Sequence, residues 1–186
     1  MKSQTIDDFD SFLESENEKL VSMLESLKDV KEDDVNAALQ RFSKILGLDY
    51  KKLSVKFEKP FESKPTLSAY QRSNNTIIIN PKCKDSKDLV FFCLAHELRH
   101  VWQYENYGDE VFMNHNSHLS IDSDKYNKQI VEIDANAFAL AAMDSLYKCW
   151  DIRIKIKCNS ADVRKDVLQT DGVSERYEEL MEQYFS

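Results

Sequence analysis

Apolar residues recur every three or four positions between residues 89 and 104, in the stretch LVFFCLAHELRHVWQY. An α-helix has about 3.6 residues per turn, so this spacing places the apolar side chains on one face. The polar residues of the stretch, two histidines among them, fall on the other side. The apolar positions are Phe91, Leu94, Leu98 and Trp102. The pattern therefore predicts an amphipathic helix with an apolar back and a polar front.

Helical periodicity also runs through the N-terminal quarter of the chain. Residues 5–29 carry apolar side chains at helical spacing, behind a capping-box pattern. A second helix is expected to begin after Asp33 or Asp34 and to end at Gly47, because glycine commonly terminates helices. We therefore expect a helical hairpin over 1–48 that packs on the rest of the protein. The alternative, a partner-binding coiled coil, has few sustained heptads to support it.

After this hairpin the apolar residues recur at every second position, as they do in a β-strand. Residues 53–57 alternate between apolar and polar and predict a half-buried strand. Two further strands are predicted at 67–71 and 76–80, joined by the polar turn 72–75. The second of these is apolar and β-branched on both faces, which indicates a buried strand that ends at Pro81.

The rest of the chain returns to helical patterns after a polar connection. The predicted elements are the helix at 89–104, capped by Asp85 or Ser86 and closed at Tyr107-Gly108, a long helix from about 123 to 147 capped by Asp122, a segment at 151–157 that fits either a strand or a helix extension, and helices at 160–169 and 174–184. The sequence therefore predicts an α+β fold with a small antiparallel or mixed sheet. We expect the hairpin (1–48) to be followed by one main domain (49–186).

Composition narrows the function classes. The chain has 186 residues, and its 33 acidic and 25 basic residues give a net charge of −8, which argues against a nucleic-acid partner. No apolar run approaches the roughly 18 residues of a membrane span, and the acidic N-terminus lacks a signal-peptide pattern. The 4 cysteines form no CxxC pair. We expect a cytoplasmic protein with reduced thiols and no membrane partner.

The polar front of the helix at 89–104 carries the motif H-E-x-x-H, formed by His96, Glu97 and His100. Residues four apart lie about 40° apart around a helix, so both imidazoles point the same way. That arrangement suits zinc, which binds histidine nitrogens at about 2.0–2.1 Å. Glu97 is then placed to act on a metal-bound water as general base. The alternative is that both histidines have packing or surface roles, but the amphipathic helix favours a metal site.

The identity of a third ligand decides the class of metal site, because catalytic zinc typically has three protein ligands and a water. Gln103 and Asn106 stand where metzincins carry glycine and a third histidine, so that class is excluded. Glu132 and Asp134 are the candidate carboxylates, and about 200° of helix rotation separates them, so both cannot face one metal. Asn136 shares a face with Glu132 and is placed to hydrogen-bond a ligand histidine, which would fix the ring.

HELRH followed by EIDANAFA resembles the gluzincin pattern HExxH…E-x-x-A-[D/N]-x-F-A. This pattern occurs in Ste24-like peptidases and in ImmA/IrrE-type metallopeptidases. The resemblance covers residues 76–145, while the N-terminal hairpin and the C-terminal tail match neither family. Asn136 stands where Ste24-like members carry aspartate, but asparagine fits the ImmA/IrrE-type pattern.

The resemblance implies a minimal zincin-like core with an active-site helix and a glutamate-bearing helix. It implies a zinc-dependent metallopeptidase acting on a protein or peptide, with Glu97 as general base and Glu132 preferred to Asp134. The implied zinc ligands are His96, His100 and Glu132. The strand at 76–80 is expected to present an edge on which an extended substrate adds. The alternatives are a zincin-fold metal-binding regulatory or interaction protein with little or no peptidase activity, and a helical protein in which the motif is accidental.

Several other polar residues are weaker candidates, each with a plainer interpretation. A histidine in a polar loop is more often solvated than ligating, and a tyrosine more often lies at the edge of a core than at an oxyanion. Arg99 could pair with a substrate carboxylate or with an acidic neighbour, and Cys93 could line the pocket or be a small buried residue. The remaining candidates are His115, His118, Tyr104, Tyr107 and Tyr126.

Overall fold

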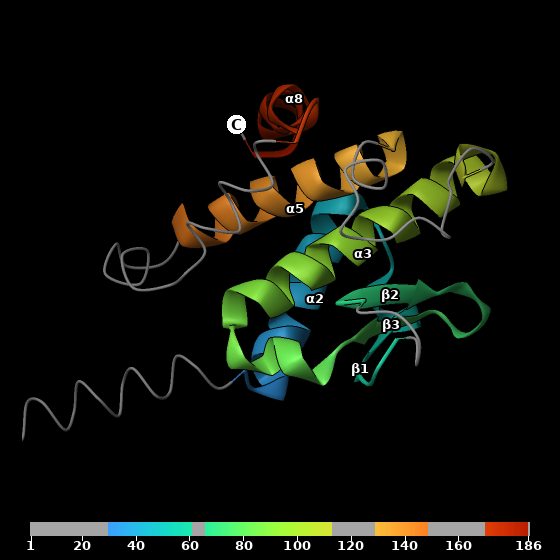
Figure 1. The fold of residues 1–186 in the computed structure, drawn as a ribbon, viewed down its shortest axis with the longest axis vertical. Helices are drawn as coiled ribbons and strands as arrows, with labels where there is room; N and C mark the ends of the chain where they lie inside the picture. The colour runs from blue at the N-terminus through green and yellow to red at the C-terminus, as the bar shows by residue number, and fades with distance from the viewer. Residues whose placement is uncertain (1–29, 61–65, 113–128, 149–169, 186) are drawn as a thin grey trace, which may run out of the picture.

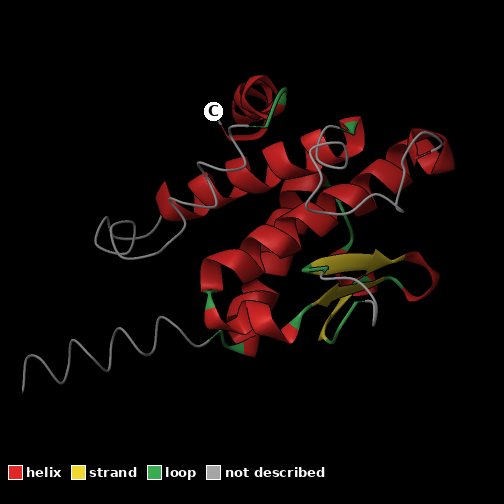
Figure 2. Cartoon of the chain, in the orientation of Figure 1, coloured by secondary structure: helices red, strands yellow, loops and turns green. Residues whose placement is uncertain are grey.

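A computed structural model describes residues 30–60, 66–112, 129–148 and 170–185 of the chain. Four helices and a three-stranded sheet make up these parts, which confirms the predicted α+β class (Figures 1 and 2). The elements are α2 (Glu32–Leu46), β1 (Ser54–Phe57), β2 (Ser68–Gln71), β3 (Thr76–Ile79), α3 (Lys87–Tyr107), α5 (Ile130–Lys148) and α8 (Val173–Phe185). Figure 2 shows the sheet on one side of the helices.

The sheet is mixed, with the strand order β1-β3-β2. β3 pairs in parallel with β1 and antiparallel with β2, so Ile77 lies opposite Val55 on one side and Tyr70 on the other. All four residues of β3 are buried, as its apolar sequence predicts. Because β3 is hydrogen-bonded on both sides, the prediction that this strand presents a free edge is wrong. Among the described residues the edges belong to β1 and β2.

α3 has the length and the start that the sequence indicates. The Ser86 hydroxyl accepts a hydrogen bond from the backbone N–H of Leu89 at 3.3 Å, so Ser86 rather than Asp85 is the N-cap. The helix ends at Gly108, whose φ of 63° suits glycine. Leu94 and Leu98 on its apolar face are fully buried. Burial of each leucine contributes about 1.5–3 kcal/mol and holds the polar front in a fixed position.

α2 packs against the start of α3 and belongs to the same apolar core. It begins at Glu32, two or three residues before the predicted start, and ends at Leu46, with Gly47 as the C-cap at the predicted position. An ion pair of 2.8 Å between Lys87 and Asp34 joins the first turns of α3 and α2. The first helix of the predicted hairpin, at 5–29, lies outside the described residues.

α5 runs back alongside α3, and α8 lies on α5 (Figure 1). α5 begins at Ile130, directly after a bend at Gln129, which is about seven residues later than the predicted start at 123. The predicted start itself lies within 113–128, outside the described residues. Small side chains let α5 approach α3 closely, because alanine adds little beyond the backbone. Five alanines of α5 have no exposed surface: Ala135, Ala137, Ala139, Ala141 and Ala142.

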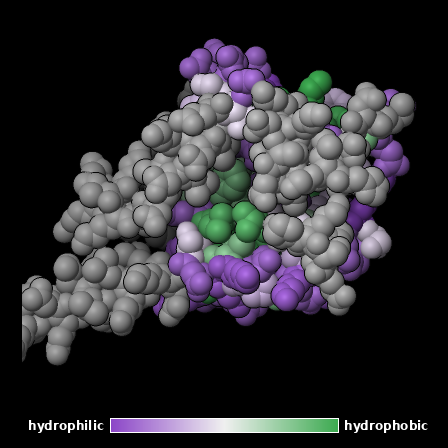
Figure 3. Space-filling model, viewed as in Figure 1, coloured by the Kyte–Doolittle hydropathy of each residue, from purple (hydrophilic) through white to green (hydrophobic). Residues whose placement is uncertain are grey.

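α8 begins at Val173 and ends at Phe185, one residue beyond the predicted 174–184 at each end. Val173 and Leu180 are fully buried, and Tyr184 packs edge-on against Phe138 of α5. The segments predicted at 151–157 and 160–169 lie outside the described residues. On the face drawn in Figure 3, the described residues are mostly hydrophilic, with an apolar patch near the centre of the view. No helix in the described ranges is long and apolar enough to cross a membrane.

Candidate metal centre

The antiparallel pairing of α3 and α5 brings together residues that lie more than thirty positions apart in sequence. His96 and His100 are one turn apart on α3, and Glu132 and Asn136 are one turn apart on α5. His96 therefore meets Asn136, while Glu132 lies within reach of both histidines. Spacings of four on two neighbouring helices thus produce one cluster.

Three side chains converge in this cluster. The Nε2 atoms of His96 and His100 are 3.0 Å apart, and the Glu132 carboxylate oxygens lie 3.3 Å from the first and 3.6 Å from the second. A tetrahedral site with bonds of about 2.0–2.1 Å separates adjacent ligand atoms by about 3.3–3.4 Å. The observed separations bracket that value, so the cluster could hold a metal ion.

Hydrogen bonds on the far side of each ring determine which nitrogen faces the cluster. The Nδ1 atom of His96 lies 3.0 Å from Oδ1 of Asn136, which is the contact that the four-residue spacing predicts. The Nδ1 atom of His100 lies 2.8 Å from Oε1 of Gln103. An amide oxygen only accepts, so each Nδ1 carries a hydrogen, and each Nε2 faces the cluster, where it can bind a proton or a metal ion.

The orientation of the Gln103 amide is itself fixed. Its nitrogen donates to the Val131 carbonyl at 3.1 Å and to the Asp134 carboxylate at 2.8 Å, so both amide hydrogens are used. Only the oxygen is then left to face His100. Two Nε2 lone pairs 3.0 Å apart repel each other unless a proton or a cation lies between them. The donor set therefore fits a cation such as zinc.

The electrostatics of the cluster favour positive charge. Burial alone would lower the pKa of His100, but the hydrogen bond and charge of Glu132, with the charge of Glu97, raise it to about 9. The Glu132 side chain is only 2% exposed, and a carboxylate buried to that degree needs a cationic partner. Aromatic rings flank the site, with Phe92 stacked near His96 and Phe112 edge-on to His100.

Glu97 lies next to this cluster and is 5% exposed. The hydroxyl of Ser68 donates to its Oε1 at 2.8 Å, which leaves Oε2 outside this bond. Ser68 is the first residue of β2, so the edge strand supplies the contact that orients the predicted general base. The sequence carries no signal for Ser68, because its role depends on how β2 packs against α3.

Asp134, the competing third ligand, is engaged elsewhere. Arg99 binds it through two nitrogens at 2.7 and 3.1 Å, and Arg176 donates to it at 2.7 Å. Burial alone would raise the pKa of Asp134, but these guanidinium groups, Arg99 above all, hold it below its ordinary value. Asp134 is therefore part of an ion pair. Arg99 was expected to pair with either a substrate carboxylate or an acidic neighbour, and in the structure it pairs with the acidic neighbour Asp134.

The remaining candidates do not join the three-residue cluster. Tyr104 stacks on Phe112, and burial raises its pKa, whereas Tyr107 is largely exposed and packs edge-on against Trp102. Cys93 is buried, as is Cys83, and both are free thiols. His115, His118 and Tyr126 lie outside the described residues.

A cavity of about 410 Å³ lies behind the cluster rather than in it. Its walls include Arg99, Trp102, Gln103, Asp134 and Arg176, whereas His96, His100 and Glu132 do not line it. The cavity therefore borders the residues that support the cluster and is distinct from the position at which the three ligand atoms converge.

These observations define an α+β protein with a His-His-Glu cluster, of which His100 and Glu132 are buried and His96 is partly buried, that could hold a metal ion. No protein-family model, curated protein or solved structure matches the chain. The geometry and chemistry of its own residues are therefore what bears on its function.

Proposed function

We propose that this protein is a zinc-dependent metallopeptidase of the gluzincin type, built on a zincin-like core. The observation that carries the proposal is the convergence of two histidine Nε2 atoms and a buried carboxylate beside Glu97. The donor set of two histidines and one glutamate is that of catalytic zinc sites, which keep a further position for water.

In this proposal His96, His100 and Glu132 hold the zinc ion. Asn136 and Gln103 keep the two rings oriented through Nδ1, as partners of metal-ligating histidines commonly do. Zinc, when bound, supplies a Lewis acid that acidifies a coordinated water and polarises a carbonyl oxygen.

Glu97 has the role of general base. Its Oε1 accepts the hydrogen bond from Ser68, so Oε2 is the atom that takes the proton of the attacking water. The same carboxyl then gives this proton to the amine that leaves when the peptide bond breaks. Ser68 holds the carboxylate in one orientation between these two proton transfers.

The substrate is proposed to lie along β2. This strand carries Ser68, which contacts Glu97, and among the described residues its one strand partner is β3. An extended peptide added to an exposed strand gains backbone hydrogen bonds. The β2 edge thus replaces β3 as the strand proposed for substrate binding, because β3 is central in the sheet.

The experiment that tests the proposal compares the parent protein with Glu97→Gln and His100→Ala. Metal content is measured on the purified proteins, and cleavage is measured by mass spectrometry on a combinatorial peptide library. We expect one zinc per parent chain, zinc but no cleavage for Glu97→Gln, and neither for His100→Ala. Cleavage by Glu97→Gln at the parental rate would refute the mechanism. A parent that binds zinc and cleaves nothing would favour the metal-binding regulatory alternative.

A further inference from the structure

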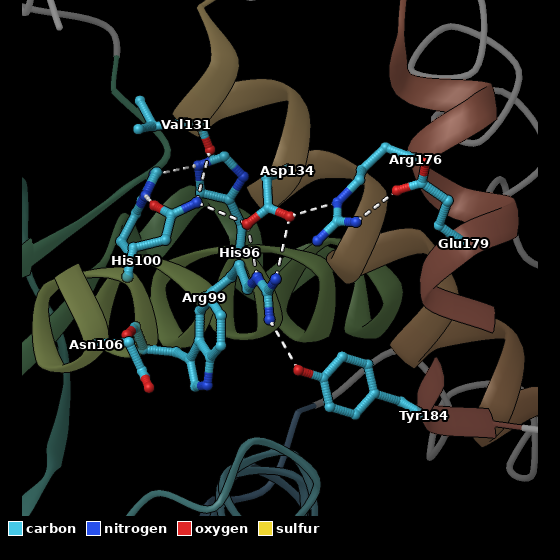
Figure 4. A network of polar contacts seen from close by, with 11 residues as sticks. His96, Arg99, His100, Asn106, Val131, Asp134, Arg176, Glu179 and Tyr184 are labelled. Carbon is cyan, nitrogen blue, oxygen red and sulfur yellow. Dashed lines mark hydrogen bonds and ion pairs between the residues drawn. The ribbon is translucent and has the colours of Figure 1, made fainter. Parts of the chain in front are cut away.

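α8 supplies no ligand to the cluster, yet one of its side chains is connected to it. Arg176 of α8 donates through Nε to Oδ1 of Asp134 on α5 at 2.7 Å (Figure 4). The guanidinium also bonds Glu179 of the same helix at 2.5 Å, so Arg176 is held from two sides. The C-terminal helix, which matches neither family in sequence, thus reaches the helix that carries Glu132.

Asp134 connects all three helices of this region. Its Oδ2 accepts from Arg99 Nε and from Gln103 Nε2, and its Oδ1 accepts from a second Arg99 nitrogen and from Arg176. A carboxylate has about four acceptor sites, so four donors fix its position completely. Loss of Arg176 removes one of the two described donors to Oδ1, so the carboxylate can shift toward Arg99.

Gln103 carries this constraint to the cluster. The bond to Asp134 is one of the two that hold its amide nitrogen, and the amide oxygen faces Nδ1 of His100. A rotated amide would present a donor to Nδ1 and would favour the tautomer in which the hydrogen sits on Nε2. That tautomer cannot bind a metal through Nε2.

We propose that Arg176 is a positioning residue of the metal site, acting through Asp134 and Gln103 on His100. The inference rests on the proposed metal site and adds α8 to it. We call this chain of contacts from Arg176 to His100 the relay. If Arg176 acted only through its charge, its removal would strengthen zinc binding, because a cation near the site would be lost. If Arg176 acts through the relay, its removal weakens zinc binding.

α8 has other anchors, so substitution of Arg176 leaves its docking in place. Val173 and Leu180 are fully buried, and Tyr177 hydrogen-bonds Asp144 of α5. The Arg176 side chain is 32% exposed, and methionine conserves its unbranched stem. A change in zinc affinity in a folded Arg176→Met protein therefore reports the relay rather than loss of the helix.

The experiment measures zinc dissociation constants by competition with a chromophoric chelator, and circular dichroism verifies folding. Direct partners of ligand histidines typically change metal affinity by about 10–100-fold, and Arg176 acts through two further contacts, so we expect about a threefold to tenfold loss in Arg176→Met. Arg176→Lys, which can still donate to Asp134, should restore most of the affinity. Glu179→Gln, which leaves the Asp134 contacts in place, is the control and should bind zinc as the parent does.

A double-mutant cycle with Gln103→Met tests the route. If the relay runs through Gln103, Arg176→Met should have no further effect on zinc affinity in the Gln103→Met background. Unchanged or tighter binding in Arg176→Met alone, or an equal loss in both backgrounds, would overturn the inference while leaving the zinc peptidase proposal intact. A parent protein that binds no zinc would refute both proposals.

Discussion

Asn136→Leu isolates the hydrogen bond that orients His96. Leucine has the same number of side-chain heavy atoms as asparagine, with the same branching at Cγ, and removes the oxygen that lies 3.0 Å from Nδ1. The hydrogen bond contributes about 0.5–1.5 kcal/mol, and 1.4 kcal/mol corresponds to about tenfold in an equilibrium constant. Without this bond the ring also gains a second tautomer and rotational freedom. For these reasons, loss of a partner of a ligand histidine typically lowers metal affinity by about 10–100-fold. We therefore expect zinc binding to weaken by about tenfold or more.

The assay is chelator competition at neutral pH, with Asn136→Asp and Ser145→Ala as companions. Aspartate keeps an acceptor for Nδ1–H and adds negative charge near the metal, so Asn136→Asp should bind zinc at least as tightly as the parent. Ser145 donates to the Ala142 carbonyl on the same helix, away from the cluster, and its loss should leave zinc affinity unchanged. Parental affinity in Asn136→Leu, or equal weakening in the aspartate variant, would refute the reasoning.

Three further outcomes are expected. Ser68→Ala should lower kcat for peptide cleavage by about tenfold, because a hydrogen bond to a charged group contributes about 1.5–3 kcal/mol, and should leave zinc affinity unchanged; an unaltered kcat would show that Glu97 needs no such support. Protein with zinc at one hundred times Kd should have a free energy of unfolding about 2.7 kcal/mol higher than protein from which a chelator has removed the zinc. Urea unfolding measures this difference, and His100→Ala should show no response to the chelator. Ala139→Leu should destabilise the fold by about 1–3 kcal/mol, because Ala139 is fully buried and a larger side chain forces the helices apart; a parental urea midpoint would contradict the close packing of α5.

The sequence predicts best those features that depend on one element alone. α3 is specified by its apolar period, its serine cap and its closing glycine, and the structure has each of these. The four-residue spacings of His96 with His100 and of Glu132 with Asn136 also predict shared faces, which the structure brings together. Local periodicity is sufficient for both because a helix fixes the relative directions of its own side chains.

Apart from the contact between His96 and Asn136, the features that depend on how two elements pack could not be predicted from the sequence. The order β1-β3-β2 places β3 in the centre, and no residue of β3 indicates whether its neighbours lie on one side or on both. In the sequence, Gln103 shows only that the chain departs from the metzincin pattern. Its position between His100 and Asp134 depends on how α3 packs against α5. Ser68 likewise has no motif, and its contact with Glu97 appears only when β2 lies beside α3.

In the proposed metal site, the close contact between α3 and α5 bears on which metal ion fits. The candidate ligand atoms lie 3.0 to 3.6 Å apart because the backbones of α3 and α5 approach each other closely. Small side chains between the helices cannot rearrange to change this distance. Calcium prefers bonds of about 2.3–2.6 Å and six to eight oxygen ligands, so it would have to push the helices apart and forgo buried contacts. In the proposed metal site, this short interhelical spacing would favour small ions that prefer nitrogen ligands and would disfavour larger ions such as calcium.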